Sequence, residues 1–408
     1  MALYETINAV APGSTSAYSG RQPKLLFLVT EDWYFCSHRL PIARAARDAG
    51  FQVIVATRVQ AHGTRITEEE FALHSLPWRR RGDGIRGAAR AVAAIARLYR
   101  TERPDIVHHI ALKPVLFGGL ARALAFAGGP DAPTIIDAVM GLGSGFSATG
   151  LAARLRRSSL GRALRLAVGH SNSRVIVQNP EDGAALTALG IEPSRIWLIR
   201  GSGIDIQHFT PLPLPKRDAV TVALVSRMLR DKGVLDAVAA IRALRARNLA
   251  IELLLAGPTD PDNSGSLSAA ALSALAAESG VIWLGAVADV REVWRRATIA
   301  LLPSTYGEGV PKALLEAAAC ARPIIATNVP GCREAVRTGE HESGLLVPPR
   351  DVNALADAIA VLAADPVRCA VMGRNGRALI ETRFAEEIVA RETLALYDRA
   401  LAERVALQ

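Results

Sequence analysis

Residues 301–319 read LLPSTYGEGVPKALLEAAA, and the rest of the chain is best interpreted from this stretch. The apolar run Ile299 to Leu302 predicts a buried strand. Pro303 and Gly307 end it, and Pro311 suits the first turn of a helix, where its missing N–H costs nothing. The pattern predicts a strand, a glycine loop and a helix N-terminus, an arrangement that favours anions through backbone N–H groups and the helix dipole.

Two carboxylates flank this loop and helix. Glu308 lies in the loop and Glu316 lies eight positions later in the helix, which separates them by about 12 Å along a helix axis. That span suits a nucleotide sugar, with one carboxylate near each end and the diphosphate between them. The alternative is a pair of solvated glutamates, since most glutamates are exposed.

A second loop carries two cations. The segment SRMLRDKG, residues 226–233, follows the predicted strand Val220 to Ser226, and Arg227 and Lys232 flank its short turn before a helix. Arginine offers a planar fork and lysine a point charge, and both suit phosphate oxygens. Two solvated cations are the alternative. Taken together with the Glu308 loop, the pair favours a phosphate site.

These residues resemble two motifs of the retaining family 4 glycosyltransferases, which have the GT-B fold. Glu308 and Glu316 match the E-x7-E motif, and Arg227 and Lys232 match the R-x4-K motif. Further segments match the family in order and spacing: AGP (256–258), WLG (283–285), PIIATNVPG (323–331) and GLLVPP (344–349). The resemblance covers nearly all of residues 220–384.

The resemblance implies a role for each matching residue. Glu308 would contact the donor sugar hydroxyls near the reacting carbon, and Glu316 would bind the nucleotide ribose. Arg227 and Lys232 would grip the donor diphosphate and stabilise the charge of the leaving group. Gly309 and Val310 would offer backbone N–H groups to the phosphates. The expected donor-binding residues are Glu316, Gly309, Val310, Pro311, Ser226 and Gly257.

The first half of the chain resembles family members of the capsule and lipopolysaccharide type, which act on lipid-linked acceptors. The matching segments are DWYFCSHRLPIARAARDAG, HHIALKP and MGLGSGF. From them we expect His109 in catalysis, with a structural histidine pair at a strand end as the alternative. The expected acceptor-binding residues are His38, His108, Lys113, Gly141 and Gly143. The loop Thr30 to Ser37 lacks the glycine pair that many members carry after the first strand.

Length and pattern predict two α/β domains. The chain has 408 residues, half of them hydrophobic, which is long for one domain. Predicted strands alternate with helices in both halves, which favours two doubly wound parallel sheets. Residues 31–37 are expected to form a loop. Domain boundaries are predicted as a tail at 1–22, an acceptor domain at 23–205, a nucleotide-sugar domain at 206–384 and a C-terminal helix at 385–408 that crosses back to the first domain. Two such domains imply a cleft between them.

The net charge of +9 comes from arginine and suggests a polyanionic partner. Residues 78–103 hold eight arginines against two acids, and residues 151–174 hold six arginines and no acid. On the predicted helix 85–100, Arg86, Arg90 and Arg97 lie away from the apolar face. These basic amphipathic segments predict peripheral contact with an anionic membrane. An ordinary helix with its apolar face in the core is the alternative.

The sequence therefore predicts a retaining GT-B glycosyltransferase. It would move a sugar from a nucleotide sugar, with UDP as the expected nucleotide, to a polyprenyl-diphosphate-linked saccharide in surface polysaccharide or lipopolysaccharide synthesis. It would need no cofactor or metal, and would act in the cytoplasm on the inner face of the membrane. The four cysteines lack metal or disulfide spacing, which suits a reducing compartment. The alternatives are a nucleotide-sugar epimerase or hydrolase on the same fold, and a basic nucleic-acid-binding protein. No aromatic residues interleave with the arginine clusters, so nucleic acid is not the expected partner.

Overall fold

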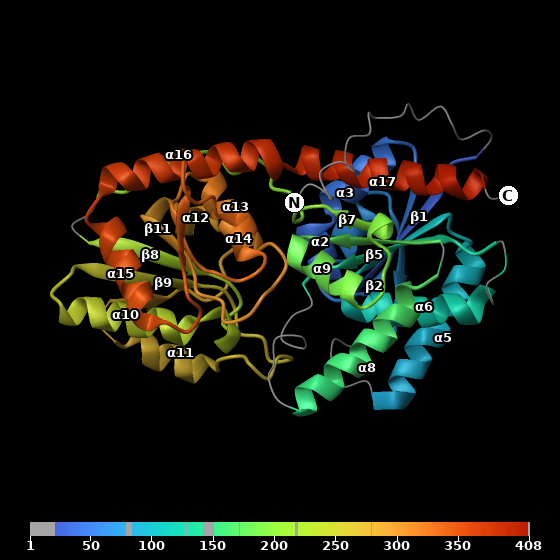
Figure 1. Cartoon of the computed structure of the whole chain (residues 1–408), viewed down its shortest axis with the longest axis horizontal. Coiled ribbons are helices and arrows are strands. Elements are labelled where there is room, and N and C mark those ends of the chain that lie inside the picture. The colour runs from blue at the N-terminus through green and yellow to red at the C-terminus, as the bar shows by residue number, and fades with distance from the viewer. Residues whose placement is uncertain are drawn as a thin grey trace. The chain divides into compact units, whose positions relative to one another are not determined.

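The computed structural model describes residues 21–78, 84–126, 129, 131–141, 151–170, 172–216, 219–278 and 280–406. It divides into two units, one of residues 1–203 with 386–408, and one of residues 204–385. Each unit has its own parallel sheet covered by helices (Figure 1). This is the GT-B architecture that the motifs predicted, with two Rossmann-like units.

The sheet of the first unit has seven strands in the order β3-β2-β1-β4-β5-β6-β7, and all of its pairings are parallel. Such an order arises when right-handed crossovers run outward in both directions from a central strand. The central strands are fully buried because helices cover both faces. The strands are β1 (Lys24–Glu31), β2 (Gln52–Arg58), β3 (Ala72–Ser75), β4 (Ile106–Ile110), β5 (Thr134–Val139), β6 (Ser173–Val177) and β7 (Ile196–Leu198).

The helices of this unit mostly follow the predicted alternation. They are α2 (Asp32–His38), α3 (Leu40–Asp48), α4 (Gly63–Thr67), α5 (Gly84–Glu102), α6 (Leu112–Phe126), α8 (Leu151–Val168), α9 (Pro180–Ala188) and α17 (Glu386–Ala406), with a 3₁₀ turn at Pro193–Arg195.

The expectation of a loop at residues 31–37 is wrong, because α2 begins directly after β1. Asp32 stabilises the tight connection between β1 and α2. Its carboxylate is buried and accepts hydrogen bonds from the N–H groups of Trp33 (2.7 Å), Gln60 (2.6 Å) and His62 (2.9 Å). Phe35 packs into the core on the opposite side of the turn.

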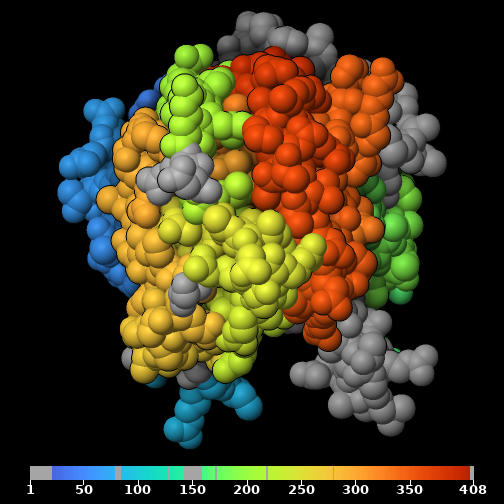
Figure 2. Space-filling model, turned by 90° about the vertical axis from the view of Figure 1, so that its left-hand side faces the viewer, coloured from blue at the N-terminus to red at the C-terminus, as the bar shows by residue number. Residues whose placement is uncertain are grey.

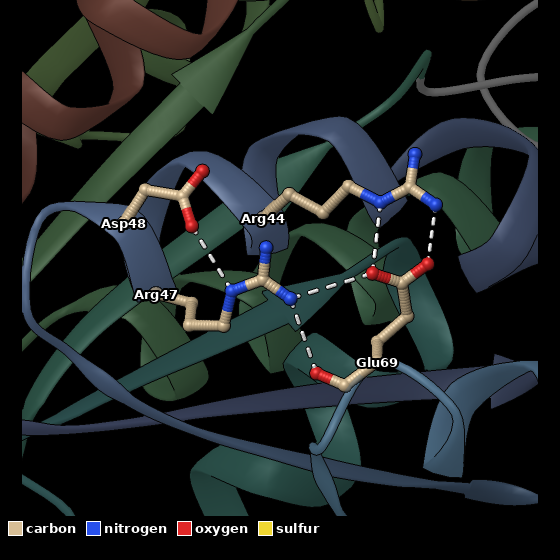
Figure 3. Close-up of polar contacts among 4 residues, drawn as sticks. All are labelled: Arg44, Arg47, Asp48 and Glu69. Carbon is tan, nitrogen blue, oxygen red and sulfur yellow. Dashed lines mark hydrogen bonds and ion pairs between the residues drawn. The ribbon is translucent and has the colours of Figure 1, made fainter.

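Helix α3 is held against the chain that leads into β3. The Arg44 guanidinium forms two hydrogen bonds with the Glu69 carboxylate, one of them 2.9 Å from Nε, and Arg47 Nη1 donates to the Glu69 carbonyl over 3.2 Å (Figure 3). Asp48 contacts Arg47 from the other side. This network fixes both the position and the rotation of α3, whose first residue follows Arg39.

The C-terminal helix α17 completes the first unit, although it follows the second unit in the chain. It packs against α3 and β5. Tyr397 on its inner face is fully buried and bonds to His108 of β4 over 2.5 Å. Near its end, Glu403 pairs with Arg174, and Arg404 donates to the carbonyl of Asp105 over 3.0 Å.

The second unit has a six-stranded parallel sheet in the order β10-β9-β8-β11-β12-β13. One strand, β13, had not been predicted as a strand. Helix α10 packs against α15, and Figure 2 shows the surfaces of these helices on the outside of the unit. The strands are β8 (Val220–Val225), β9 (Ile251–Ala256), β10 (Val281–Trp283), β11 (Ile299–Leu302), β12 (Ile324–Thr327) and β13 (Gly344–Val347). The helices are α10 (Val234–Ala246), α11 (Ala269–Ala276), α12 (Arg291–Arg296), α13 (Lys312–Ala319), α14 (Cys332–Ala335), α15 (Val352–Ala363) and α16 (Pro366–Arg383), with a 3₁₀ turn at Arg230–Lys232.

Among the described residues, no helix combines the length and apolar character needed to cross a membrane. The four cysteines are free and buried.

Candidate active site

The second unit contains the expected strand, loop and helix. Strand β11 is fully buried and is followed at once by Pro303. Helix α13 starts at Lys312, so Pro311 is the residue that precedes its first turn rather than a member of it. The Pro311 carbonyl accepts from Leu314 N over 3.1 Å and from Leu315 N over 3.3 Å. The loop 303–310 therefore runs directly into the positive end of a helix.

Glu308 lies in this loop and is held by two partners. Its Oε1 accepts a hydrogen bond from Ser304 Oγ over 2.6 Å, and its Oε2 forms an ion pair with Lys232 Nζ. The side chains of Glu308 and Lys232 are 18% and 15% exposed, so the pair is partly shielded from water but still reachable. The structure thus brings together one residue from each of the two motifs.

Arg227 is the arginine of the R-x4-K motif. It pairs with a carboxylate that was not among the predicted site residues. Its Nη1 donates to Asp260 Oδ2. Asp260 lies in the loop after β9, and its own N–H donates to Ser266 Oγ over 2.9 Å. Asp260 is largely buried, whereas Arg227 stays about one-third exposed. Asp260 therefore holds the guanidinium on one side, and part of the Arg227 side chain remains exposed to solvent.

Backbone hydrogen bonds join the loops that carry these side chains. Met228 N donates to the Pro258 carbonyl over 2.9 Å, which ties the Arg227 loop to the Asp260 loop. Thr305 N donates to the Asp231 carbonyl over 2.9 Å, which ties the Lys232 loop to the Glu308 loop. Three loops that follow β8, β9 and β11 are thus one connected framework. These are carboxyl ends of parallel strands, where ligands bind in sheets of this type.

Two glycines allow the backbones to approach this closely. At Gly257 (φ +143°) a Cβ would lie 1.8 Å from the Ser226 carbonyl oxygen, so the first two loops can touch only through glycine. At Gly331 (φ +82°) a Cβ would lie 2.3 Å from the carbonyl oxygen of Glu308 and 2.4 Å from that of Gly309. The loop after β12 therefore supports the Glu308 loop from behind.

Glu316 lies on α13, with 12% of its side chain exposed and its carboxylate 4.0 Å from Lys312 Nζ. Burial raises the pKa of Glu316 to about 7, and the nearby Lys312 charge opposes that shift. A carboxylate poised to titrate near neutrality is common in functional sites. Val310, which precedes the helix, is buried and packs into the core of this unit.

Among the described residues, no group of three or more His, Cys, Asp or Glu side chains gathers in a way that could hold a metal ion.

In the first unit, the structure contradicts the prediction that His109 is catalytic. Its ring is 0% exposed. Its Nδ1 lies 2.7 Å from Asp137 Oδ1, and its Nε2 lies 2.8 Å from Tyr99 OH. Asp137 also accepts from Ser173 Oγ over 2.8 Å. A fully enclosed ring with both nitrogens bonded cannot touch a substrate, so His109 has a structural role that links α5, β4, β5 and β6.

His108 is also 0% exposed, and its Nδ1 bonds to Tyr397 OH. This burial contradicts direct contact between His108 and an acceptor. This burial could not be predicted from the sequence, because two histidines at a strand end form the same pattern whether or not helices cover them. Position 108 is enclosed by Phe27 and by α17, which comes from the far end of the chain.

The other predicted acceptor residues stay near the surface. Lys113 Nζ lies over the rings of Trp78 (5.6 Å) and Phe117 (5.1 Å). The ring of His38 stacks on Tyr34 with centroids 4.1 Å apart, and its Nδ1 lies 2.6 Å from Ser37 Oγ. Gly141 has φ +85° and follows the end of β5. Gly143 lies outside the described residues.

Sequence reasoning missed Asp260 and Ser304. Asp260 lies four residues after the end of β9, and Ser304 lies two residues after the end of β11. Asp260 in the segment PTDPDN could have been noticed as an acid among turn residues. Its pairing with Arg227 depends on β8 and β9 being neighbours in the sheet, which the sequence does not state.

Comparison with known proteins agrees with this geometry. The family model described as "Glycosyl transferases group 1" matches residues 219–365, and the model "Glycosyl transferase 4-like" matches residues 24–154. The chain is 26% identical over 384 residues to N,N'-diacetylbacillosaminyl-diphospho-undecaprenol alpha-1,3-N-acetylgalactosaminyltransferase of Campylobacter jejuni, covering 89% of this chain and 95% of that protein.

Solved structures share the fold along the whole chain. Sucrose-phosphate synthase of Thermosynechococcus elongatus superposes with a TM-score of 0.78 at 23% identity, covering 94% of this chain and 100% of that one. The HepE protein of Anabaena, solved with UDP and glucose, superposes with a TM-score of 0.75 at 19% identity, covering 92% and 100%. The two family models, one for each half, and the relative that matches 89% of the chain together show that this chain is a glycosyltransferase, with the GT-B fold of the solved structures.

Proposed function

We propose that this glycosyltransferase moves a sugar from a nucleotide sugar to a polyprenyl-diphosphate-linked saccharide, with retention of configuration, in the synthesis of a surface polysaccharide or lipopolysaccharide. The observation that carries the donor half is the pairing of Lys232 with Glu308 beside Arg227, at the N-terminus of α13. Two cations and a helix N-terminus in one connected framework provide what a diphosphate requires.

In this proposal the second unit binds the donor. Arg227 and Lys232 hold the diphosphate, and the N–H groups of Gly309 and Val310 face its oxygens. Glu308 accepts hydrogen bonds from the donor sugar, and Glu316 accepts them from the ribose. Pro311, Ser226 and Gly257 shape the loops around these groups. UDP is the first nucleotide to test, as the Anabaena protein was solved with it.

The reaction would proceed on one face of the donor sugar. The oxygen of the acceptor hydroxyl forms a bond to the anomeric carbon while the bond from that carbon to the phosphate oxygen breaks. The hydroxyl proton passes to the departing phosphate, which keeps the new bond on the same face. Arg227 and Lys232 stabilise the negative charge that develops on this leaving group. The ion pair of Lys232 with Glu308 keeps both side chains in place before the donor arrives.

The acceptor proposal draws on the Campylobacter relative, whose name specifies an undecaprenol diphosphate acceptor. In this chain the residues proposed to contact the acceptor are Lys113, His38, Gly141 and Gly143.

Peripheral attachment to the inner face of an anionic membrane would bring the enzyme to such an acceptor. Helix α5 supports this part of the proposal, because Ile85 in its first turn is 91% exposed and Arg86, Arg90 and Arg97 are exposed along it. An apolar residue among arginines suits the boundary of a bilayer.

The test of the reaction is turnover of a nucleotide-sugar panel, with and without a polyprenyl-linked lipid extract, by the native enzyme and by Glu316→Ala. Lipid-dependent nucleotide release that Glu316→Ala lowers by at least about tenfold in kcat/KM would support the proposal. Release that ignores lipid would instead favour an epimerase or hydrolase. Absence of turnover and of binding to any nucleotide would refute the donor assignment.

Membrane contact has its own test. The native enzyme should sediment with anionic liposomes at low salt, and the triple change of Arg86, Arg90 and Arg97 to Glu should abolish sedimentation and lower activity on lipid acceptor. Turnover of a water-soluble acceptor analogue by the same variant serves as the control. If the liposomes never bind the enzyme, the membrane part of the proposal fails while the reaction stands. Competition with duplex and single-stranded DNA tests the nucleic-acid alternative.

A further inference from the structure

Arg39 is a buried cation that the donor site does not use. It joins α2 to α3 in the first unit and is 4% exposed. Its Nε has no hydrogen-bond partner, and its Nη2 donates to Met140 Sδ over 2.5 Å. Among the described residues, no carboxylate pairs with it. Burial lowers the pKa of Arg39 from its ordinary value, which reports that the charge lacks compensation.

A buried charge of this kind is costly for a folded chain, because buried charges are normally paired and fully hydrogen bonded. A thioether sulfur is only a weak acceptor. The arrangement is thus poorly satisfied as it stands, and an anion near the guanidinium would supply the missing partner.

Three donors from separate elements converge on the sulfur of Met140. Besides Arg39 Nη2, Gln178 Nε2 approaches Sδ to 3.6 Å and Tyr34 OH approaches it to 3.9 Å. Tyr34 comes from α2, Met140 follows β5 and Gln178 follows β6. A cation, an amide and a hydroxyl directed at one atom form the donor set that a phosphate oxygen would receive. Met140 holds that position with a flexible, easily displaced side chain.

The position of the Met140 sulfur lies at the edge of the sheet where ligands bind. Met140 and Gln178 both lie just beyond the carboxyl ends of their strands, which is the binding edge of a doubly wound sheet. Two side chains that meet at this position, Tyr34 and Met140, are themselves only partly buried. Displacement of the Met140 side chain would therefore expose the guanidinium to an incoming group.

Two buried groups near Arg39 are neutral and add no compensating charge, namely His108 and Tyr397. Burial, and then the charge of Arg39, lower the pKa of His108 well below its ordinary value. Burial raises the pKa of Tyr397, so its hydroxyl keeps its proton. The Nε2 atom of His108 also lacks a partner. His108 and Tyr397 therefore leave the charge of Arg39 uncompensated.

Arg39 is also held in place in advance. Its N–H donates to the Phe35 carbonyl over 2.8 Å, so the backbone of α2 fixes its start. Helix α3, which follows it, is bound through Arg44 and Arg47 to Glu69 (Figure 3). A site held this firmly loses little conformational entropy when it binds an anion.

We propose that Arg39, Tyr34 and Gln178 form an anion subsite that binds a phosphate group of the acceptor, with a phosphate oxygen taking the position of Met140 Sδ. The identity of the acceptor rests on the proposed function. The subsite itself rests on the unpaired guanidinium and the convergent donors. It gives acceptor recognition to Arg39 in place of the enclosed histidine pair.

Arg39→Met is the decisive variant, because it removes the charge and nearly keeps the apolar volume. We expect its Tm to equal or exceed that of the native enzyme, since replacement of a buried unpaired charge by an apolar side chain is neutral or stabilising. We expect kcat/KM for the lipid acceptor to fall by about tenfold or more, with KM for the nucleotide sugar unchanged. Arg65→Met, which removes an exposed cation of α4 in the same unit, is the matched control and should leave acceptor kinetics intact.

Inorganic pyrophosphate tests the subsite without any turnover. In an Arg227→Ala background, which weakens the donor site, pyrophosphate should still raise the Tm. Adding Arg39→Met should abolish that shift, whereas adding Arg65→Met should not. A pyrophosphate shift that survives Arg39→Met would overturn the subsite.

The two proposals fail in different ways. A native enzyme that shows no lipid-dependent transfer but loses its pyrophosphate shift with Arg39→Met would refute the proposed acceptor and leave the anion subsite standing. Normal transfer by Arg39→Met, or a marked loss of its stability or solubility, would show that Arg39 is a structural residue and refute the inference.

Discussion

At the scale of single residues, Glu316 predicts a pH dependence. Its pKa of about 7 lies above the ordinary value because of burial, so the folded chain holds its proton between about pH 4.5 and 7 where the unfolded chain has lost it. This group therefore stabilises the fold at low pH, and that contribution is lost as the pH rises through 7. Ribose binding needs the opposite form, because the ionised carboxylate accepts hydrogen bonds from hydroxyls.

We expect the Kd for nucleoside diphosphate to rise by about tenfold for each pH unit below 7 in the native enzyme. Isothermal calorimetry between pH 5.5 and 8.5 measures it. Glu316→Gln should bind more weakly at pH 8 and show a flat profile over the same range. A native profile that is equally flat would exclude titration of Glu316 from donor binding.

The ion pair of Asp260 with Arg227 predicts that the two residues have coupled effects on the binding of nucleoside diphosphate. Because Asp260 holds one side of the guanidinium, Asp260→Ala should leave Arg227 mobile and raise the Kd for nucleoside diphosphate by about tenfold. Asp260→Asn keeps an acceptor oxygen and should recover most of the affinity. In an Arg227→Ala background, Asp260→Ala should cost nothing further. Additive effects in this double-mutant cycle would show that Asp260 acts only through the stability of its loop.

At the scale of elements, the turn after β12 predicts that a substitution at Gly331 weakens donor binding through a displaced backbone. A Cβ at Gly331 would collide with the carbonyl oxygens of Glu308 and Gly309, so Gly331→Ala should displace the Glu308 loop and raise the donor KM by about tenfold or more. Gly339→Ala is the matched control, since Gly339 also has a positive φ (+78°) but a Cβ added there would meet no atom within 4 Å. It should cost about 1 kcal/mol of stability and leave KM unchanged. Equal kinetics for both variants would refute support of the loop by Gly331.

At the scale of the whole molecule, the chain returns from the second unit to complete the first. Helix α17 contributes Val389, Leu396, Tyr397 and Leu401 to the core of the first unit. We expect a chain that ends at Ala385 to lose the cooperative unfolding of the first unit, because removing α17 exposes these side chains and His108. Calorimetry should then show that the unfolding transition of the first unit is absent or has a lower Tm. Nucleotide should still raise the Tm of the second unit. Unchanged unfolding of the first unit would refute this dependence.

The sequence by itself determined the second unit almost completely. Its strands and helices follow from hydrophobic periodicity, and the residues at 227, 232, 308 and 316 lie on loops and a helix that local rules already predict. The signal was strong because each motif is short and contiguous, and because strand ends in one sheet meet at one edge.

Tertiary structure decided what packs over what. The histidines at 108 and 109 became core residues because α5 and α17 cover them, and these helices are remote in sequence. Asp260 became the partner of Arg227 because β8 and β9 pair in the sheet. Arg39 became a buried cation because α2 formed where a loop was expected. Burial and pairing are properties of contacts distant in the chain, and local sequence rules do not encode them.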